Sequence, residues 1–199
     1  GSNGGGIGDN WGAEWDIVTD MAIKLVPGSH FQHSMAEAAA NAARKGDIAA
    51  ADIKSITLSR PGMTQIGGPR HPKDLIDMAH SAAYFMAAGA ADHEFTWAHA
   101  TPKKIADPVI HGLIDKVQIG PEPTENIAAY RQGATVTIET TDGRSVTDTV
   151  LVPNGAGCLG IDWSDIDAKY RNLAPAALNA EQVAASLTVL HDFRQVTDV

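Results

Sequence analysis

The chain has 199 residues, of which 44% are hydrophobic and 20% are charged, so it can bury a core and cannot be disordered throughout. It carries 15 basic and 24 acidic residues, and the formal net charge of −9 argues against a nucleic-acid-binding protein. No apolar run approaches the roughly 20 residues that cross a bilayer, so we expect no membrane-spanning segment. Cys158 is the only cysteine, which excludes an internal disulfide and a cysteine zinc cluster. With no signal-peptide pattern at the N-terminus, we expect a cytoplasmic protein.

Residues 1–10 are mostly glycine with polar spacers and cannot form a core. We expect this segment to be a flexible start, either the remnant of a tag or the result of a cut inside a longer protein. Residues 11–199 are predicted to form one domain.

The first part of the chain predicts two helices and a strand. Apolar residues at helical spacing predict a helix over residues 15–25, which the Pro27-Gly28 pair ends. An alanine-rich helix is expected over residues 31–44, closed by a basic last turn and a glycine. Alternating apolar residues predict a strand over residues 52–59.

A loop over residues 67–70 precedes Pro72, and proline suits the first turn of a helix that we expect over residues 73–88. The buried face of this helix is rich in alanine, which lets a neighbouring backbone come close. Short helices are expected over residues 95–98 and 107–114.

Three further strands are predicted, over residues 115–120, 134–139 and 145–152. The last two flank Asp142-Gly143, a dipeptide typical of a two-residue hairpin turn. We therefore expect these two strands to pair as neighbours in an antiparallel arrangement.

The chain ends with two predicted helices, over residues 163–173 and 180–196. Ser164 and Asp167 have the spacing of a capping box at the start of the first one. Helices outnumber strands, and the last strands form a hairpin. The predicted class is therefore α+β, with a small, largely antiparallel sheet covered by helices.

The densest group of polar residues surrounds the Pro27-Gly28 break. Lys24, His30 and His33 gather there, and Glu37 would share a helix face with His33. A metal site can be drawn through these residues, but the spacing dictates no third ligand, and we expect no bound metal. Two interpretations stay open, a histidine that only makes structural hydrogen bonds and an acid/base or substrate-binding histidine.

A second group is cationic and precedes a predicted helix N-terminus: Arg60, Arg70, His71 and Lys73. In an acidic protein such a group could hold a carboxylate or a phosphate. Alternatively, its members are solvated loop charges.

In a third group, His80, Ser81 and Tyr84 have spacings that can crowd one side of a helix. Instead of a functional role, each of these side chains could simply be buried in the core. A serine nucleophile is not supported, since the chain has no Gly-x-Ser-x-Gly turn. Residues 92–94 are predicted to lie in a loop, and no partner is predicted for His99, His111 or His191.

The order of these segments resembles the C-terminal half of the MmgE/PrpD family, which includes 2-methylcitrate dehydratase, cis-aconitate decarboxylase and iminodisuccinate epimerase. Lys24-Leu25-Val26-Pro27, with His33 six residues after the proline, is similar to the family's Lys-x-x-Pro segment. Arg70-x-Pro72 and His80-Ser81-x-x-Tyr84 resemble its Arg-x-Pro loop and its His-Ser/Cys-x-x-Tyr helix. Asp107-Pro108-Val109, Asp142-Gly143-Arg144 and residues 163–173 follow in family order, so the resemblance covers roughly residues 11–199.

The resemblance implies that this α+β domain caps an all-helical N-terminal half, with the active site between the two. It implies small di- or tricarboxylate substrates and a proton moved at a carbon next to a carboxylate, without a metal or an organic cofactor. Ala79 stands where many members carry a basic residue, which weakens any assignment of one substrate. The resemblance implies that His33 and Tyr84 line the active-site cleft, and we expect these two to be catalytic. As substrate-binding residues we expect Lys24, His30, Arg70, His80 and Ser81, with Lys24 and Arg70 holding carboxylates and His80 positioning the site.

Two hypotheses follow. In the first, the chain is the cap part of a lyase (a dehydratase or decarboxylase) or of an isomerase such as an epimerase, and is inactive without the helical half. In the second, it is a non-catalytic carboxylate-binding or subunit-assembly domain that kept the fold. The expected partners are a small polycarboxylate, the helical half and further copies of the chain in a homo-oligomer such as a dimer. If His33 and Tyr84 both act on one substrate, they must lie close together and face one cleft.

Overall fold

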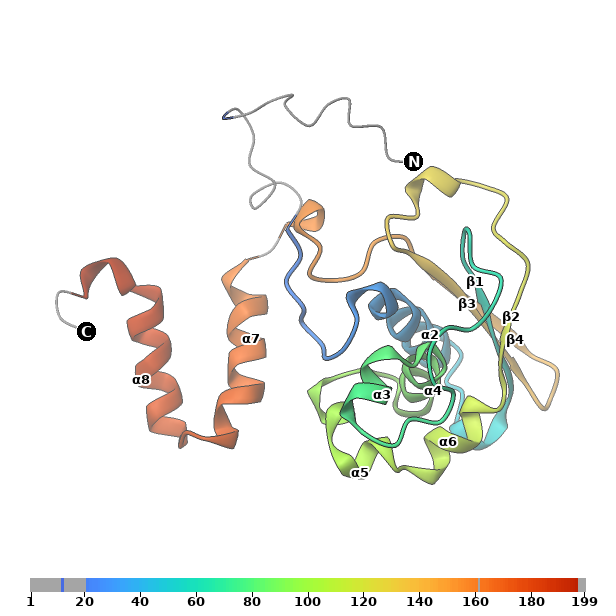
Figure 1. Ribbon diagram of the computed structural model, residues 1–199, viewed down its shortest axis with the longest axis horizontal. Helices are drawn as coiled ribbons and strands as arrows, with labels where there is room; N and C mark the ends of the chain where they lie inside the picture. Colours follow the sequence, from blue (N-terminus) through green and yellow to red (C-terminus); the bar gives the residue numbers. More distant parts are fainter. Residues whose placement is uncertain (1–11, 13–20, 161, 197–199) are drawn as a thin grey trace.

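The computed structural model describes residue 12, residues 21–160 and residues 162–196. The flexible segment predicted over residues 1–10 lies outside these ranges, and so do residues 15–20 of the first predicted helix. A four-stranded sheet of order β2-β1-β3-β4 carries helices against one face, while helices α7 and α8 lie to one side of this body (Figure 1).

The sheet is built around β1 (Ile53–Ser59). This strand pairs in parallel with the short edge strand β2 (Val117–Ile119) and antiparallel with β3 (Ala134–Thr140). β3 in turn pairs antiparallel with β4 (Ser145–Val150), and Asp142-Gly143 lies in the turn between them. The sheet is thus mostly antiparallel, and the predicted α+β class is confirmed.

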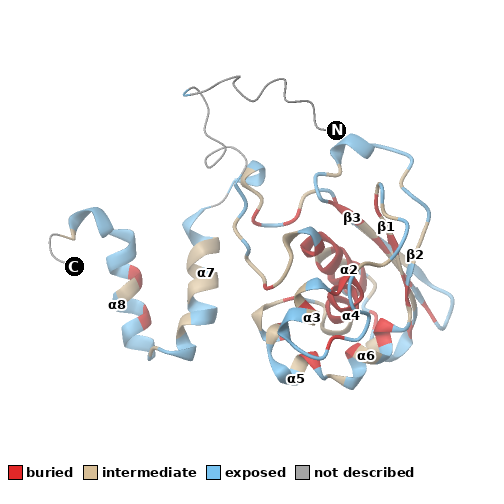
Figure 2. Cartoon of the chain, viewed as in Figure 1, coloured by how far each residue is buried: buried red, intermediate tan, exposed pale blue. Residues whose placement is uncertain are grey.

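The core lies between the sheet and two helices, α2 (His33–Lys45) and α4 (Ala82–Asp92), where the buried residues are concentrated (Figure 2). The two helices pack closely on each other because small residues face across the contact. A Cβ added to Gly89 of α4 would lie 2.4 Å from the carbonyl oxygen of Ala36 in α2. This close approach agrees with the alanine-rich face that the sequence predicts.

The prediction of a single helix over residues 73–88 is wrong at two places, its start and its middle. The chain instead forms α3 (Leu75–His80) and then α4, with Ser81 between them in an extended conformation at ψ 96°. The Ser81 hydroxyl accepts a hydrogen bond from the Tyr84 amide at 3.1 Å and so caps α4. Asp74 rather than Pro72 begins α3, because its carboxylate accepts from the Asp77 amide.

Residues 21–25 are not helical, which corrects the described part of the predicted helix over residues 15–25. Ala22 forms an antiparallel bridge with Ala156, and the Ile23 amide donates to the Gly155 carbonyl at 2.7 Å. A Cβ on Gly155 would lie 2.1 Å from the Ile23 carbonyl oxygen. The glycine-containing loop therefore leaves room for an extended backbone, and this pairing outweighs the helical spacing of the apolar residues.

The remaining helices are α5 (Pro102–Ile105), α6 (Pro108–Ile114), α7 (Trp163–Leu173) and α8 (Ala180–His191). A 3-10 turn over residues 97–100 replaces the short helix predicted at 95–98, and α8 ends before the predicted residue 196.

Asp162 caps α7 through the amides of Ser164 and Asp165, so the predicted capping role of Ser164 is wrong. Within the described ranges, none of the helices has the length and apolar character to cross a membrane.

Candidate active site

The candidate site begins where the chain turns into α2. Gly28 has φ +87°, and a Cβ there would lie 2.5 Å from Cζ of Phe85, so the Pro27-Gly28 turn packs directly on α4. The Ser29 amide donates to the Ala79 carbonyl at 3.0 Å and fixes the turn to the end of α3. A 3-10 turn, His30–Gln32, then leads into α2, whose first residue is His33.

His33 is buried, with 3% of its surface exposed, and neither ring nitrogen has a hydrogen-bond partner among the described residues. Burial lowers its pKa from the ordinary 6.5 to about 4, and the nearby His30 and Lys24 add to this effect. The backbone of Gly28 and Pro27 opposes the shift, although it does not meet hydrogen-bond geometry with either ring nitrogen. His33 is therefore a neutral imidazole at physiological pH.

Further polar atoms near His33 are also buried without a partner in the described part of the chain. The His30 ring meets the His33 ring edge-on at 4.9 Å between centroids. His30 Nδ1 lies 3.0 Å from Oε1 of Gln132, while its Nε2 is unpaired. Gln32 donates from Nε2 to the His80 carbonyl at 2.7 Å, while its Oε1 is unpaired. Buried polar atoms of folded proteins are normally paired, so this cluster is suited to a polar ligand.

His33 lines a cleft of about 260 Å³ that runs along α2. Glu37 accepts hydrogen bonds from Asn154 there, from the backbone amide at 3.2 Å and from Nδ2 at 2.7 Å, and burial raises the pKa of its carboxyl. The other lining residues are Leu25, Val26, Ala36, Ala40, Asn41, Arg44, Glu94 and Phe95. Sequence reasoning missed Asn41, Glu94 and Asn154. Asn41 follows His33 and Glu37 at helical spacing on α2 and could have been noticed, whereas Glu94 and Asn154 reach the cleft only through tertiary packing.

Tyr84 lies in the core and does not line the cleft. Its hydroxyl donates to the His99 carbonyl at 2.8 Å, and burial together with Asp107 and Asp92 raises its pKa. Its ring meets that of Phe95 edge-on, and Phe95 does line the cleft.

The other predicted site residues divide into two sets. His30 and His33 are brought together, and Lys24 is near enough to lower the His33 pKa, but Lys24 is exposed and neither Lys24 nor His30 lines the cleft. The structure uses Arg70, His80 and Ser81 in contacts of the fold. Arg70 donates to the carbonyls of Ile114 and Val117, the His80 Nδ1 lies 2.9 Å from the Ile76 carbonyl, and Ser81 caps α4.

The two arginines of the predicted cationic group, Arg60 and Arg70, make separate contacts in the folded chain. Arg60 is buried and donates to the Phe31 carbonyl at 2.6 Å, with its guanidinium 3.6 Å above the centre of the Phe31 ring. Burial lowers the Arg60 pKa to about 10. Arg60 and Arg70 thus contact protein carbonyls rather than share one anion site.

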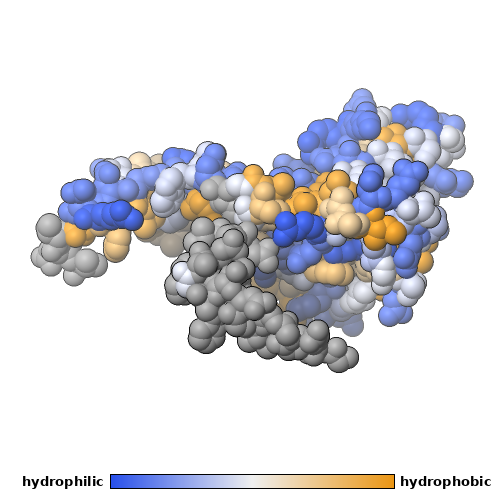
Figure 3. All heavy atoms as spheres, turned by 90° about the horizontal axis from the view of Figure 1, so that it is seen from above, coloured by the Kyte–Doolittle hydropathy of each residue, from blue (hydrophilic) through white to orange (hydrophobic). Residues whose placement is uncertain are grey.

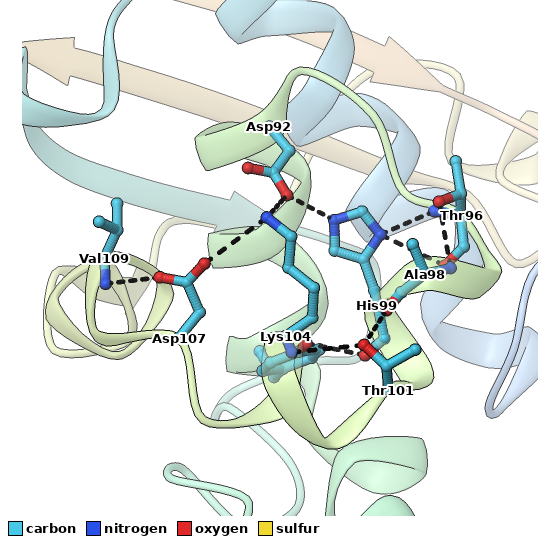
Figure 4. A network of polar contacts seen from close by, with 9 residues as sticks. Asp92, Thr96, Ala98, His99, Thr101, Lys104, Asp107 and Val109 are labelled. Carbon is cyan, nitrogen blue, oxygen red and sulfur yellow. Dashed lines mark hydrogen bonds and ion pairs between the residues drawn. The ribbon is translucent and has the colours of Figure 1, made fainter.

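A second buried histidine, His99, lies in a fully paired network that sequence reasoning missed (Figure 4). Its Nε2 lies 2.9 Å from Oδ2 of Asp92, and its Nδ1 accepts from the Thr96 amide at 2.9 Å. Lys104 also binds the Asp92 carboxylate. Asp92 is the last residue of α4 rather than a loop residue, and Thr96-x-x-His99 is a capping-box spacing that could have been noticed.

A sequence model described as the MmgE/PrpD C-terminal domain matches residues 27–194. The chain belongs to the MmgE/PrpD family. The match begins six residues before His33 and extends past α8, so this MmgE/PrpD domain includes both the body and the α7–α8 pair. A search among curated protein sequences gives no match. Among the described residues of this family member, no three histidine, cysteine or acidic side chains are grouped as a typical metal site requires.

Proposed function

We propose that this domain is the cap of a cofactor-independent lyase or isomerase, which moves a proton at a carbon next to a carboxylate of a small di- or tricarboxylate. The observation that carries the proposal is His33, a residue of the cleft wall that lies near His30 and Lys24 and whose two buried ring nitrogens have no partner among the described residues. A neutral imidazole offers a lone pair that can take a proton.

Lys24 supplies the positive charge that a substrate carboxylate needs in a chain of net charge −9. Once a carboxylate lies near His33, its negative charge raises the His33 pKa toward the working pH. The C–H bond next to the carboxylate then breaks, His33 takes the proton, and the electron pair stays on carbon. That pair either expels a leaving group, which is a lyase reaction, or is protonated again on the other face, which is an epimerisation.

Tyr84 enters the proposal as a positioning residue, because its ring packs against Phe95 at the cleft and its hydroxyl is bound within the core. Arg70, His80 and Ser81 likewise hold the α3–α4 turn against which the Pro27-Gly28 turn packs. Their proposed contribution to substrate binding is the position of the turn rather than a direct contact.

The helical N-terminal half of the family is the proposed partner, together with further copies of the chain in the cytoplasm. Large apolar side chains on α7, on α8 and after it are exposed, among them Trp163, Leu190 and Phe193. Figure 3 shows further apolar residues at the junction between this pair of helices and the body. Exposed apolar surface of this kind marks protein interfaces.

A proton-exchange assay tests the proposal. The chain is combined with the helical half of a family member and small di- and tricarboxylates in D₂O, and deuterium incorporation is followed by NMR. We expect exchange with the natural chain and with His93→Asn, since His93 binds the Ile48 carbonyl, does not line the cleft and has a φ that asparagine tolerates. His33→Asn should abolish exchange while carboxylate binding persists. Exchange that persists in His33→Asn would contradict the role of His33.

The non-catalytic alternative is favoured by one observation, the use of Arg70, His80, Ser81 and Tyr84 in contacts of the fold. Binding of a polycarboxylate without any exchange or turnover in the assembled protein would support that alternative.

A further inference from the structure

A pair of histidines lies outside the cleft, between the loop before α3 and helix α6. The rings of His71 and His111 are nearly parallel, with 18° between their planes, and their centroids are 5.2 Å apart. Their Nδ1 atoms face each other at 3.0 Å. The His71 side chain is 44% exposed, so an ion from solvent can reach the pair.

The outer nitrogens of both rings lie beside oxygens that can only accept. His71 Nε2 is 2.9 Å from Oδ1 of Asp115, and His111 Nε2 is 2.7 Å from the Ile105 carbonyl oxygen. Each Nε2 therefore carries a hydrogen, and a neutral imidazole has only one N–H. When both rings are neutral, both Nδ1 atoms present lone pairs to each other, a repulsive arrangement that a cation between them, either a proton or a metal ion, would relieve.

We propose that His71 and His111 form a two-histidine site for a divalent transition metal ion that favours imidazole ligands, such as Zn²⁺, Ni²⁺ or Cu²⁺. Two nitrogens about 2.0–2.1 Å from a tetrahedral zinc ion lie roughly 3.3 Å apart, so metal binding requires the pair to open and both rings to turn until their lone pairs meet at the ion. Metal-binding histidines usually donate their other N–H to a carboxylate or a backbone carbonyl, and both rings here do so. Water completes the coordination at this exposed position.

The metal would fasten the loop that holds Arg70 to the segment from α6 to β2. Arg70 already makes this connection, through hydrogen bonds from Nη2 to the carbonyls of Ile114 and Val117. A metal between His71 and His111 adds a second link between the same two segments. Binding should therefore raise the stability of the folded chain.

The test uses the whole chain, freed of metal with a chelator, and Zn²⁺ alone as the probe. Thermal unfolding and calorimetric titration are measured with the natural chain, His71→Ala, His111→Ala and two controls. His191→Ala is the matched control, because His191 also has Nε2 2.9 Å from a carboxylate, that of Asp167, but its ring faces Trp163 rather than a second imidazole. His30→Ala removes the other close pair of histidines.

We expect Zn²⁺ to raise the Tm of the natural chain and of both controls. The shift should be lost in His71→Ala and in His111→Ala, whose metal-free Tm stays near the natural value. Asp115→Asn should weaken zinc binding about tenfold or more, because it disturbs the second shell. The proposal is overturned if Zn²⁺ causes no shift in the natural chain, or if the shift survives in His71→Ala or disappears in His30→Ala. In that case the two Nδ1 atoms share a proton and nothing else.

Discussion

His33 and His99 are both buried histidines, with 3% and 1% of their surfaces exposed, but they differ in their hydrogen bonds. Both ring nitrogens of His99 are paired, with Asp92 and with the Thr96 amide, whereas the described residues offer His33 no partner. A paired buried histidine contributes to the fold, while an unpaired one costs stability. This contrast is the reason for which we propose that His33, and not His99, acts on a ligand.

The largest expected effect comes from making the same substitution at both positions. His99→Leu removes the partner of the Asp92 carboxylate and of the Thr96 amide, and should lower the free energy of unfolding by about 3 kcal/mol. His33→Leu removes two unpaired nitrogens and keeps most of the volume, so stability should stay equal or rise. Urea denaturation measures both. An equal loss at the two positions would show that His33 has a partner that stabilises the fold.

The second effect is on the pH dependence of stability. The His33 pKa is about 4 in the folded chain and near 6.5 when unfolded, so the unfolded state binds the proton first as the pH falls. This group should have no effect above its unfolded pKa and should cost up to about 3 kcal/mol as the pH falls from roughly 6.5 to 4. His33→Leu should remove this part of the pH dependence. Denaturation of both proteins across that range gives the difference, and parallel curves would contradict the lowered pKa.

A third comparison tests how closely α4 packs on α2, the helix that begins with His33. Gly89→Ala should destabilise the chain by about 2 kcal/mol, because the new Cβ would lie 2.4 Å from the Ala36 carbonyl oxygen. Gly112→Ala in α6 is the matched control, since nothing lies within 4 Å of its Cβ position. It should stabilise the chain by about 0.5–1 kcal/mol through helix propensity. Thermal or urea unfolding that ranked the two variants the other way would contradict the close approach of the helices.

The smallest effect concerns the charge near His33. Lys24 lowers the His33 pKa, so Lys24→Met should raise it. The titration of the His33 ring, followed by NMR in both proteins, measures the change. The His99 signals serve as an internal control, because its polar partners are Asp92 and Thr96. An unchanged His33 midpoint would place the Lys24 ammonium too far away to hold a carboxylate there.

Much of the fold could be predicted from local signals. The alanine-rich pattern predicted α2, the alternation of apolar residues predicted β1, and Asp142-Gly143 predicted the hairpin. The break at Ser81 could not be predicted, because the sequence around it contains neither glycine nor proline and a side-chain hydrogen bond decides it. The pairing of Ala22 with Ala156 likewise depends on a loop far along the chain.

In the candidate site, too, some placements follow from local sequence and others depend on tertiary contacts. Lys24, His30 and His33 are close in sequence, so the turn at Pro27-Gly28 was enough to predict that they gather. The contacts of Arg70 and Tyr84 depend on which neighbour each side chain meets after folding, and helical spacing does not determine that. The resemblance to the family predicted which residues to inspect but not which of them lie at the cleft.

The parallel pairing of β1 with β2 has a consequence for the order of folding. All of α3 to α6 lies between these two strands in the chain, so their ladder can form only after a long loop has closed. The β3–β4 hairpin needs only a tight turn and forms from neighbouring residues. We therefore expect the hairpin to form early and β2, a three-residue edge strand, to join the sheet late. The same strand should then be the first part of the sheet to open in the native protein, and its amides should exchange with solvent ahead of those of β1 and β3.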